Sequence, residues 1–360
     1  MSLLLKLSVT KKYTYINSDG LPVGDICFTM LKLRWRWRWI LLLFLVLFIF
    51  LSAIIHRPDG LKDTEGITPA HDGLRIVQAA AAILERRPLL VTIINDGFVP
   101  MTYNWLCHTA GIPNLHDDIL LLAEDDVTRQ RVQRDWPRLH IVSVESAGGE
   151  GPRLSGELNF YTVAYVRMMA LRTRLLNELL QAGYAFVLFE TDFVWFENPV
   201  PDFLDLARTK NLDLVGTNSS VDDQIMCGAF IYFRNTSRTR AVWAEVTRLM
   251  EELVEKMKVL DPTQSPPRKQ NEQRYLNRLL VEKHKGIRYG LVDFETSVID
   301  GVWYKFNKTR RQTLHPKAIH NNFLDTTREK VKRFKDFGQW VLNDDNTCNK
   351  DKVQKLLEGK

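Results

Sequence analysis

Four short apolar segments constrain the fold of this chain more than any other feature of its sequence. They have the length and residue types of buried strands, and they cover residues 89–94, 119–122, 140–144 and 185–189. Helical patterns lie between them over residues 101–110 and 159–181, and Gly183 follows the second pattern as a helix terminator. Because strands that alternate with helices pair in parallel, the pattern predicts an α/β fold with helices packed around a parallel sheet.

Residues 39–55 form a separate apolar segment of seventeen residues that contains one serine and no charge. At about 1.5 Å per residue, a helix of this length reaches about 26 Å, which is near the lower limit for crossing a bilayer. A secretory signal peptide is the competing interpretation, but the following residues IIHRP (54–58) contain no small-x-small cleavage site. We therefore expect an uncleaved transmembrane signal anchor.

The basic charge of the chain is concentrated in front of this segment. Residues 1–38 contain seven Lys and Arg against two Asp, which leaves 42 basic and 41 acidic residues in the rest of the chain. This distribution argues against a nucleic-acid partner and places residues 1–38 in the cytoplasm as a tail. The expected product is a single-pass type II membrane protein with its folded part in the lumen, and a short span suits Golgi membranes. Whether the native start is Met1 or Met30 stays open.

The remaining chain divides by composition. Residues 56–87 mix prolines, glycines and charges before an alanine-rich run, which is typical of a stem. We expect one folded domain over residues 88–345 and a C-terminal tail over residues 346–360. The expected lumenal part contains three N-glycosylation sequons, at Asn218, Asn235 and Asn307.

The cysteines exclude a disulfide scaffold and a zinc site. Cys27 lies in the expected tail, and the lumenal part contains Cys107, Cys227 and Cys348. Three thiols form at most one bridge, and their spacing does not reveal which pair forms it. No CxxC or HExxH motif occurs among the scattered histidines.

Two acidic residues follow the fourth apolar segment directly, namely Glu190 and Asp192. In open α/β sheets ligands bind at the carboxyl ends of the strands, so this is where a functional site is expected. In extended chain the two side chains point to opposite sides, so one can hold a metal while the other meets a sugar or ribose hydroxyl. Carboxylate oxygens suit Mg²⁺ or Mn²⁺. The alternative is that both residues only cap the turn before Pro199.

The segment GYAFVLFETDFVWFENP (183–199) resembles the core GY-x-VL-x-D-x-D-VVWL-x-DP of the nucleotide-diphospho-sugar transferase domain, glycosyltransferase family 77. Further matches follow in order over roughly residues 89–340. They are VTIIN (91–95), NWLC (104–107), Tyr165, RT (172–173), CGAFIY (227–232), NEQ (271–273), and HNN (320–322) with Lys330, Phe334 and Trp340.

This resemblance implies a GT-A fold, in which a Rossmann-like mixed sheet has helices on both faces and is merged with an acceptor half. It implies a membrane-anchored, metal-dependent glycosyltransferase that moves a sugar from a nucleoside diphosphate sugar, UDP-sugar rather than GDP-sugar, to a glycan or glycoprotein. The expected metal is Mn²⁺ or Mg²⁺, and transfer is expected to retain the anomeric configuration. Two alternatives remain open, a non-catalytic homologue that binds glycans or partner proteins and a hydrolase that uses the acidic pair.

The resemblance also assigns roles to single residues. Asp192 and His320 are the expected metal ligands, with Glu190 as a third ligand or a donor contact, although the family usually has Asp at this position. Glu272 also replaces an Asp, beside Gln273, and these two are the expected catalytic residues. Whether the Glu272 carboxylate acts as a nucleophile or stabilises oxocarbenium charge stays open.

The expected donor-binding residues are Asn95, Asp96, Arg172, Glu190 and Lys330. From the residues alone, each has a plainer interpretation. Asn95 and Asp96 can form an Asx-turn into Gly97, Arg172 can pair with Glu178, and Lys330 can be a solvated helix charge. His320 can equally be an ordinary buried histidine. Trp195 is expected in the core, and Trp303 is a candidate for an acceptor pocket.

Overall fold

The computed structural model of the chain describes residues 69–83, 88–144, 154, 156–219, 225–266 and 270–358. The chain divides into two compact units, residues 1–65 and 66–360, and every described residue belongs to the second. The expected cytoplasmic tail and the expected anchor at residues 39–55 lie outside the described residues. Among the helices that are described, none has the length and apolar character needed to span a bilayer.

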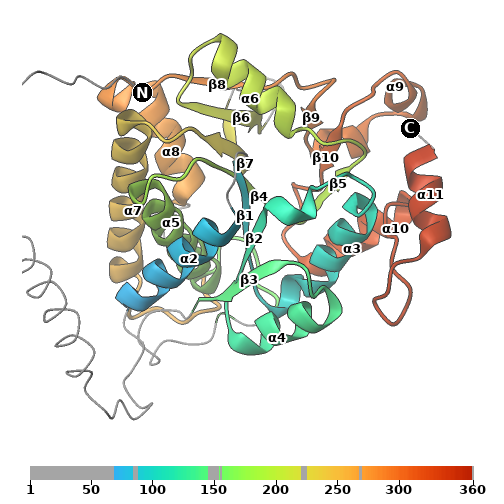
Figure 1. The fold of residues 1–360 in the computed structure, drawn as a ribbon, viewed down its shortest axis with the longest axis horizontal. Coiled ribbons are helices and arrows are strands. Elements are labelled where there is room, and N and C mark those ends of the chain that lie inside the picture. Colours follow the sequence, from blue (N-terminus) through green and yellow to red (C-terminus); the bar gives the residue numbers. More distant parts are fainter. Residues whose placement is uncertain are drawn as a thin grey trace, which may run out of the picture. The chain divides into compact units, whose positions relative to one another are not determined.

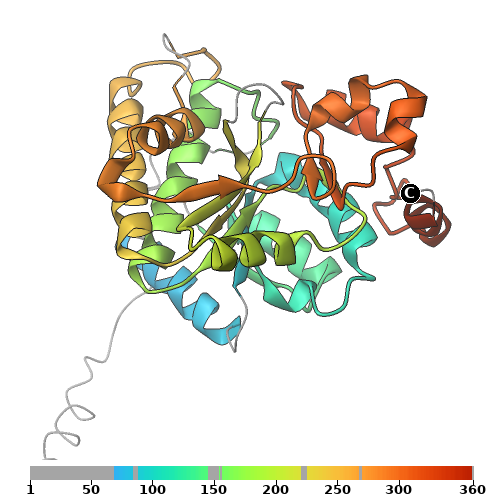
Figure 2. The ribbon, with the colours of Figure 1, turned by 90° about the horizontal axis from the view of Figure 1, so that it is seen from above.

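A seven-stranded sheet in the order β3-β2-β1-β4-β7-β6-β8 forms the centre of the domain (Figures 1 and 2). The strands are β1 (Leu89–Ile94), β2 (Ile119–Ala123), β3 (His140–Ser143), β4 (Phe186–Phe189), β6 (Leu214–Asn218), β7 (Met226–Phe233) and β8 (Tyr289–Leu291). The first four pair in parallel, β7 runs antiparallel to both of its neighbours, and β6 and β8 are parallel. The four predicted strands and the predicted α/β class are confirmed, and the sheet is mixed as the resemblance implied.

Alternating side chains of the central strands fill two separate cores. In β1, Leu89 and Val91 belong to one apolar cluster, whereas Leu90 and Ile94 belong to the other. Because successive side chains of a strand point to opposite faces, a strand that is apolar throughout must be covered on both sides.

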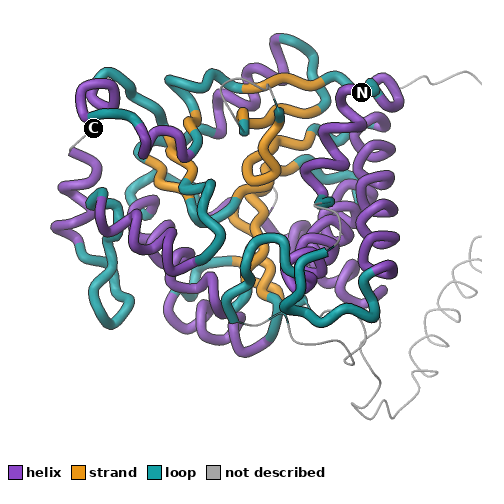
Figure 3. The backbone as a smooth tube through the Cα atoms, turned by 180° about the vertical axis from the view of Figure 1, so that it is seen from behind, coloured by secondary structure: helices purple, strands orange, loops and turns teal. Residues whose placement is uncertain are grey.

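Helices provide this cover on each face, and the views from front and back agree (Figures 1 and 3). One face carries α2 (Pro69–Ile83), α5 (Val163–Gln181), α7 (Ser237–Lys256) and α8 (Glu272–Val281), and the other carries α3 (Val99–Thr109), α4 (Asp126–Asp135) and α6 (Val200–Thr209). The helix that was predicted from residue 159 begins at Val163, because the hydroxyl of Thr162 caps it by accepting a hydrogen bond from the Tyr165 backbone N–H. It ends before Gly183, whose φ of +100° suits glycine.

A small second sheet carries His320, one of the predicted site residues. Its order is β5-β10-β9, with β5 (Phe193–Trp195), β10 (Ala318–His320) and β9 (Val298–Ile299). β10 pairs antiparallel with β5 and parallel with β9. The chain after β9 forms η4 (Gly301–Lys305) and α9 (Lys308–Gln312), and the chain after β10 forms α10 (Thr327–Asp336) and α11 (Lys350–Glu358).

The structure revises both boundaries that composition gave the domain. Helix α2 falls within the expected stem, yet it packs on α5 and buries Ile76 and Ala80 in the core. Helix α11 falls within the expected C-terminal tail, yet it contacts α3 and buries Leu356. Both segments are amphipathic helices, and their apolar faces are stable only when they are covered by the sheet or its helices.

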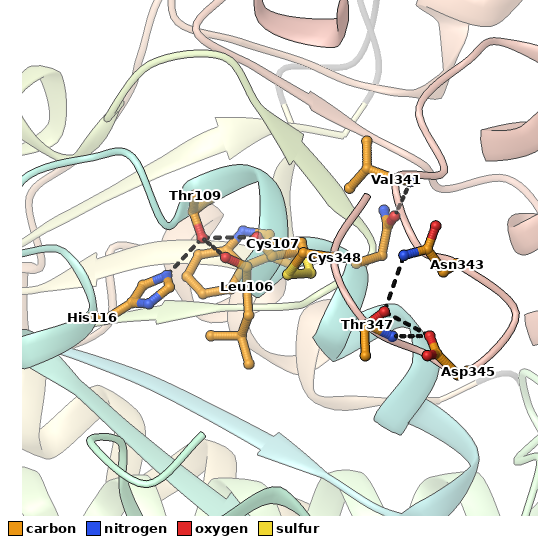
Figure 4. The surroundings of a disulfide bond; sticks show 11 residues. Leu106, Cys107, Thr109, His116, Val341, Asn343, Asp345, Thr347 and Cys348 are labelled. Atoms are coloured by element: carbon orange, nitrogen blue, oxygen red, sulfur yellow. Dashed lines mark hydrogen bonds between the residues drawn. A yellow bond between two sulfur atoms is a disulfide. The ribbon is translucent and has the colours of Figure 1, made fainter. Parts of the chain in front are cut away.

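A disulfide joins Cys107 of α3 to Cys348, across 241 residues of sequence (Figure 4). Cys227 is the free and buried thiol of the described part of the chain. Asp345 stabilises the loop that carries Cys348. Its Oδ1 accepts hydrogen bonds from the Thr347 backbone N–H and hydroxyl (Figure 4). The sequence left three pairings open, and this bond fixes the C-terminal segment to the main domain.

Candidate active site

The candidate site lies where two neighbouring parallel strands end. β1 is flanked by β2 on one side and β4 on the other, so the strand order reverses its direction at this point. The chain leaves β1 at Ile94 and β4 at Phe189. In open α/β sheets a ligand binds in the crevice at such a switch point, beyond the carboxyl ends of the strands.

Asp192 is at the centre of the site and is 1% exposed. The Lys330 Nζ donates a hydrogen bond to its Oδ2 at 2.8 Å, and the His320 Nε2 lies 3.4 Å from its Oδ1. His320 is brought there by the antiparallel pairing that sets it opposite Phe193, and its ring stacks on the Phe193 ring at 4.1 Å. The Asn321 backbone N–H donates to the Asp192 carbonyl at 2.9 Å and fixes the same junction.

The charges of this cluster stabilise one another. Burial disfavours an ionised Asp192, but the attraction of Lys330 and His320 outweighs it and holds the Asp192 pKa well below its usual range. Burial likewise opposes a charged imidazole, yet Asp192 raises the pKa of His320 to about 10. The same carboxylate raises the pKa of Lys330 against the effect of burial.

Arg172 of α5 connects the two glutamates of the site. Its Nη1 donates to the Glu190 Oε1 at 2.5 Å and its Nη2 donates to the Glu272 Oε1 at 2.6 Å. Arg172 and Glu272 are buried, and Glu272 is the first residue of α8. Burial raises the Glu272 pKa and Arg172 opposes this rise. The alternative pairing of Arg172 with Glu178 is wrong, because the guanidinium points into the site.

Three side chains of the site form a set that can hold a metal ion. One ligand atom each of Glu190, Asp192 and His320 lie within 4.8 Å of one another. The expectation that Glu190 and Asp192 point apart is wrong in this respect, because the chain bends after Glu190 instead of staying extended. The Asp192 Oδ1 is buried and accepts no hydrogen bond from the described residues. Two carboxylates and an imidazole fit Mn²⁺ or Mg²⁺, so the residues present match the implied cofactor.

Gln273 supports the site through strand β7. Its Oε1 accepts a hydrogen bond from the Gly228 backbone N–H at 2.8 Å. A Cβ on Gly228 would lie 3.2 Å from the Gln273 Cβ, so this close approach favours glycine. Gln273 and Glu272 both line the cavity, and their predicted catalytic roles stay predictions.

Asn95 and Asp96 hold a loop over the end of β1. The Asn95 Nδ2 donates to the carbonyls of Leu154 and Gly156 at 2.6 and 2.8 Å, and its Oδ1 accepts the Phe98 backbone N–H. The Asp96 Oδ1 accepts the backbone N–H of Gly97 and of Gly156. Asn95 thus caps the short 3₁₀ helix at residues 96–98 rather than forming the alternative Asx-turn, and neither Asn95 nor Asp96 is among the residues that line the cavity. Their role in donor binding stays a prediction.

The cavity between these groups has a volume of about 240 Å³ and is lined by Arg172, Glu190, Glu272, Gln273, His320 and Lys330 together with apolar residues. The cavity is also lined by two exposed aromatic rings, those of Phe160 (41% exposed) and Phe323 (51% exposed). Phe323 lies in the turn after His320 and has a φ of +61°, a left-handed conformation that is strained for a bulky residue.

Sequence reasoning missed three of the residues around this cavity. Phe160 was included in the predicted helix 159–181 but lies in the turn before α5, and a position directly after the HNN segment was the one available signal for Phe323. Cys227 was read as a thiol and as the first residue of the CGAFIY match, but its contact with the site was not predicted, and its Sγ lies 3.8 Å from the His320 Nδ1. The core position of Trp195 is confirmed, and Trp303 lines a different cavity.

Comparison with known proteins agrees with this geometry. The family model for nucleotide-diphospho-sugar transferase matches residues 114–334, more than half of the chain. UDP-D-xylose:L-fucose alpha-1,3-D-xylosyltransferase 1 of Arabidopsis thaliana is 24% identical over 285 residues, which cover 75% of this chain and 74% of that protein. UDP-galactose:fucoside alpha-3-galactosyltransferase of Dictyostelium discoideum is 25% identical over 175 residues, which cover 47% of this chain and 27% of that protein.

Among solved structures, the apo-form glycosyltransferase GlyE of Streptococcus pneumoniae TIGR4 aligns with a TM-score of 0.40 and 9% identity, over 76% of this chain and 64% of that chain. A TM-score of this size does not define a fold, so the assignment depends on the sequence match. The matched range contains Asp192, His320 and Lys330. The chain belongs to the nucleotide-diphospho-sugar transferase family.

Proposed function

We propose that this protein is a metal-dependent glycosyltransferase that moves a sugar from a UDP-sugar to a glycan or glycoprotein acceptor with retention of anomeric configuration. The observation that carries the proposal is the convergence of Glu190, Asp192 and His320 at the switch point of the sheet, in a chain of this family. The family match supports the donor class, and retention stays an expectation from the resemblance noted in the sequence.

Glu190, Asp192 and His320 would hold the Mn²⁺ or Mg²⁺ ion, which supplies positive charge for the diphosphate leaving group. Lys330 is the second positive group at this point, because its ammonium reaches the Asp192 carboxylate from α10 and lines the cavity. In our proposal Lys330 stabilises the charge that develops on the departing diphosphate.

The pairing of Glu272 with Arg172 argues against a role for this carboxylate as the nucleophile. Its Oε1 accepts a charge-assisted hydrogen bond from Arg172, whereas its Oε2 has no partner among the described residues. A carboxylate that is paired with a guanidinium has reduced nucleophilicity but keeps its negative charge. We therefore assign Glu272 to stabilising oxocarbenium charge at the donor sugar, with Gln273 positioned beside it.

The names of the relatives suggest a narrower donor and acceptor. Both relatives use a UDP-sugar, xylose in one and galactose in the other, and both names specify a fucose acceptor. We extend this to the present chain as UDP-xylose or UDP-galactose donors and a fucose-containing glycan. The exposed rings of Phe160 and Phe323 provide flat apolar surfaces for such an acceptor at the cavity.

We also propose that the protein is a single-pass type II protein of the Golgi membrane with its catalytic domain in the lumen. The apolar segment 39–55 and the basic tail before it motivate this topology. The Cys107–Cys348 disulfide agrees with an oxidising compartment. Of the sequons, Asn307 is exposed, whereas the Asn235 Nδ2 donates to the carbonyls of Leu180 and Tyr184 and is engaged within the fold.

The test is calorimetric titration of the full-length chain with UDP in the presence and absence of Mn²⁺, followed by turnover of UDP-xylose and UDP-galactose with and without a fucoside. Wild-type protein should bind UDP only with the metal, and Asp192→Asn should abolish this binding. Asp336→Asn is the matched control, because Asp336 is an exposed carboxylate paired with Lys332 on α10. Absence of metal-dependent UDP binding in the wild type would overturn the proposal.

The turnover measurement distinguishes a transferase from a hydrolase and from a non-catalytic homologue. A transferase forms a glycosylated fucoside, whereas a hydrolase releases free sugar at the same rate with or without the acceptor. A non-catalytic homologue binds UDP or glycan but turns over neither donor.

A further inference from the structure

A second cavity, with a volume of about 1290 Å³, lies on the opposite side of β10 from the candidate active site. Ile319 lines this second cavity, and the next residue, His320, lines the first. Successive side chains of a strand point to opposite faces, so the three-stranded sheet separates the two cavities. Nothing in the proposed transfer reaction uses the second cavity.

Most of its walls come from the C-terminal part of the chain, and Phe196 and Glu197 after β5 add to them. The C-terminal walls are η4 with α9, the turn at residues 314–316 before β10, the end of α10 with the chain that follows it, and the C-terminal segment with α11. The Cys107–Cys348 disulfide fixes this last wall to α3. A cavity assembled in this way is held by covalent and packing constraints and is largely pre-formed.

The cavity is strongly cationic. Its lining includes the basic residues Lys308, Arg311, Lys335, Lys352 and Lys355, together with His315. Among the described residues, none of these five Lys and Arg side chains forms an ion pair with a carboxylate. The lining contains two acidic residues, Glu197 and Asp344. Unpaired cations in a concave site concentrate the field and attract anions.

Aromatic rings give the same cavity flat apolar surfaces. The Arg311 guanidinium lies 5.4 Å from the Trp303 ring and 5.1 Å from the Phe337 ring, and the Lys335 Nζ lies 5.8 Å from the Trp340 ring. The Trp303 indole N–H is buried and has no acceptor among the described residues. The rings therefore hold Arg311 in place, and a donor group is left without a partner in the lining.

We propose that this cavity binds an anionic saccharide, one that carries carboxylate or sulfate groups, as a part of the acceptor remote from the sugar that is modified. The choice of a saccharide rests on the proposed glycosyltransferase function, whereas the anionic character rests on the cations of the cavity. A concave site with ring faces suits a pyranose chain, since ring faces pack against its apolar side and the cations pair with its charged groups. A membrane surface is instead recognised by a basic face that lies flat on the bilayer, whereas these cations line a concave site.

The test is calorimetric titration of the full-length chain with a mannuronate trisaccharide, a heparin-derived tetrasaccharide and neutral maltotriose. Wild-type protein should bind at least one of the two anionic saccharides and not maltotriose. Lys308→Glu/Lys355→Glu should weaken that binding by about tenfold or more, because it reverses two exposed charges at the cavity. UDP binding in the presence of Mn²⁺ should stay unchanged in this variant, since neither lysine lies in the first cavity.

Lys210→Glu/Lys256→Glu is the matched control, with the same change in net charge at two exposed lysines outside both cavities. Equal weakening by the two double variants, absence of saccharide binding to the wild type, or full competition by inorganic sulfate at the same concentration would overturn the proposal. Binding to anionic lipid vesicles without binding to either saccharide would also overturn it. Wild-type protein that binds an anionic saccharide but not UDP would refute the proposed function and leave the anionic site in place.

Discussion

The Lys330 Nζ and the Asp192 Oδ2 are 2.8 Å apart although 138 residues separate them in the sequence. This contact joins α10 to the end of β4 and places a cation beside the central carboxylate of the site. His320 and Arg172 add positive charge from two other elements, opposite Glu190 and Glu272. The buried charges are therefore balanced by the chain itself, which is what allows so many of them to share one small region.

Lys330→Met should lower kcat by about 100-fold or more, because it removes a positive group from the place where diphosphate charge develops. Lys330→Arg should keep part of the activity. Steady-state kinetics with the UDP-sugar found by the turnover screen provides the measurement. Lys332→Met on the same helix is the control, since Lys332 is exposed and paired with Asp336. Normal kcat in Lys330→Met would remove Lys330 from the reaction.

Glu190→Asp/Glu272→Asp should lower kcat/KM by about 100-fold rather than raise it, because a misplacement of about 1 Å in a preorganised site has effects of this size. Each shorter carboxylate loses its reach to Arg172, which holds both glutamates at 2.5 and 2.6 Å. Comparing the activity of the double variant with that of the wild type distinguishes an active site that uses these glutamates from a degenerate site. A gain in activity would show that the glutamates mark a degenerate site, as the non-catalytic alternative requires.

Cys348→Ser should lower the free energy of unfolding by about 3–5 kcal/mol, because the disulfide closes a loop of 241 residues and limits the entropy of the unfolded chain. The measurement is thermal or denaturant unfolding with and without a reductant. The reductant should destabilise the wild type and have no further effect on Cys348→Ser. A reductant effect of equal size on both proteins would locate the sensitivity elsewhere.

His108 should make the fold sensitive to acid. Burial lowers its pKa from 6.5 to about 3, and its Nε2 accepts a hydrogen bond from the Trp195 backbone N–H. Below pH 6.5 the imidazole is protonated in the unfolded chain but stays neutral in the folded chain. The contribution of His108 to the free energy of unfolding is therefore fully present at neutral pH and is lost as the pH falls toward 3. Between pH 6 and 4 this site should contribute a loss of roughly 1 kcal/mol per pH unit.

The measurement for His108 is the free energy of unfolding against pH for the wild type and for His108→Gln, which keeps an acceptor for the Trp195 N–H. The variant should show the shallower slope over this range. Parallel slopes would mean that the imidazole titrates alike in the folded and unfolded chain.

Strands β1, β2 and β4 of the main sheet were predictable because they are apolar on both faces, whereas β6, β7 and β8 were not among the predicted strands. Residues of β1 and β4 alternate between two cores, and a continuous apolar run is the sequence signature of such a strand. The small sheet was not predictable in the same way, because β5, β9 and β10 have only two or three residues each. Strands this short carry no period, and their pairing depends on contacts between distant parts of the chain.

The candidate site also has a part that the sequence could predict and a part that it could not. Asp192, Glu190 and His320 could be selected because they match family positions, and the structure brings them together. The link from Arg172 to both glutamates could not be predicted, since three separate elements meet at the guanidinium. Asn95 looked like a ligand-binding residue because it ends β1, but its amide is used by the backbone of Leu154 and Gly156.

Strand β10 acts as a shared partition, since Ile319 faces one chamber and His320 the other. A slip of one residue in the pairing of β10 with β5 would turn the imidazole away from Asp192 and toward the basic chamber, with isoleucine taking its former place. Such a slip would damage both chambers together. Lineages of this chain should therefore accept insertions and deletions in the connection from β9 to β10, which a loop can absorb, far more readily than insertions or deletions within β10 itself.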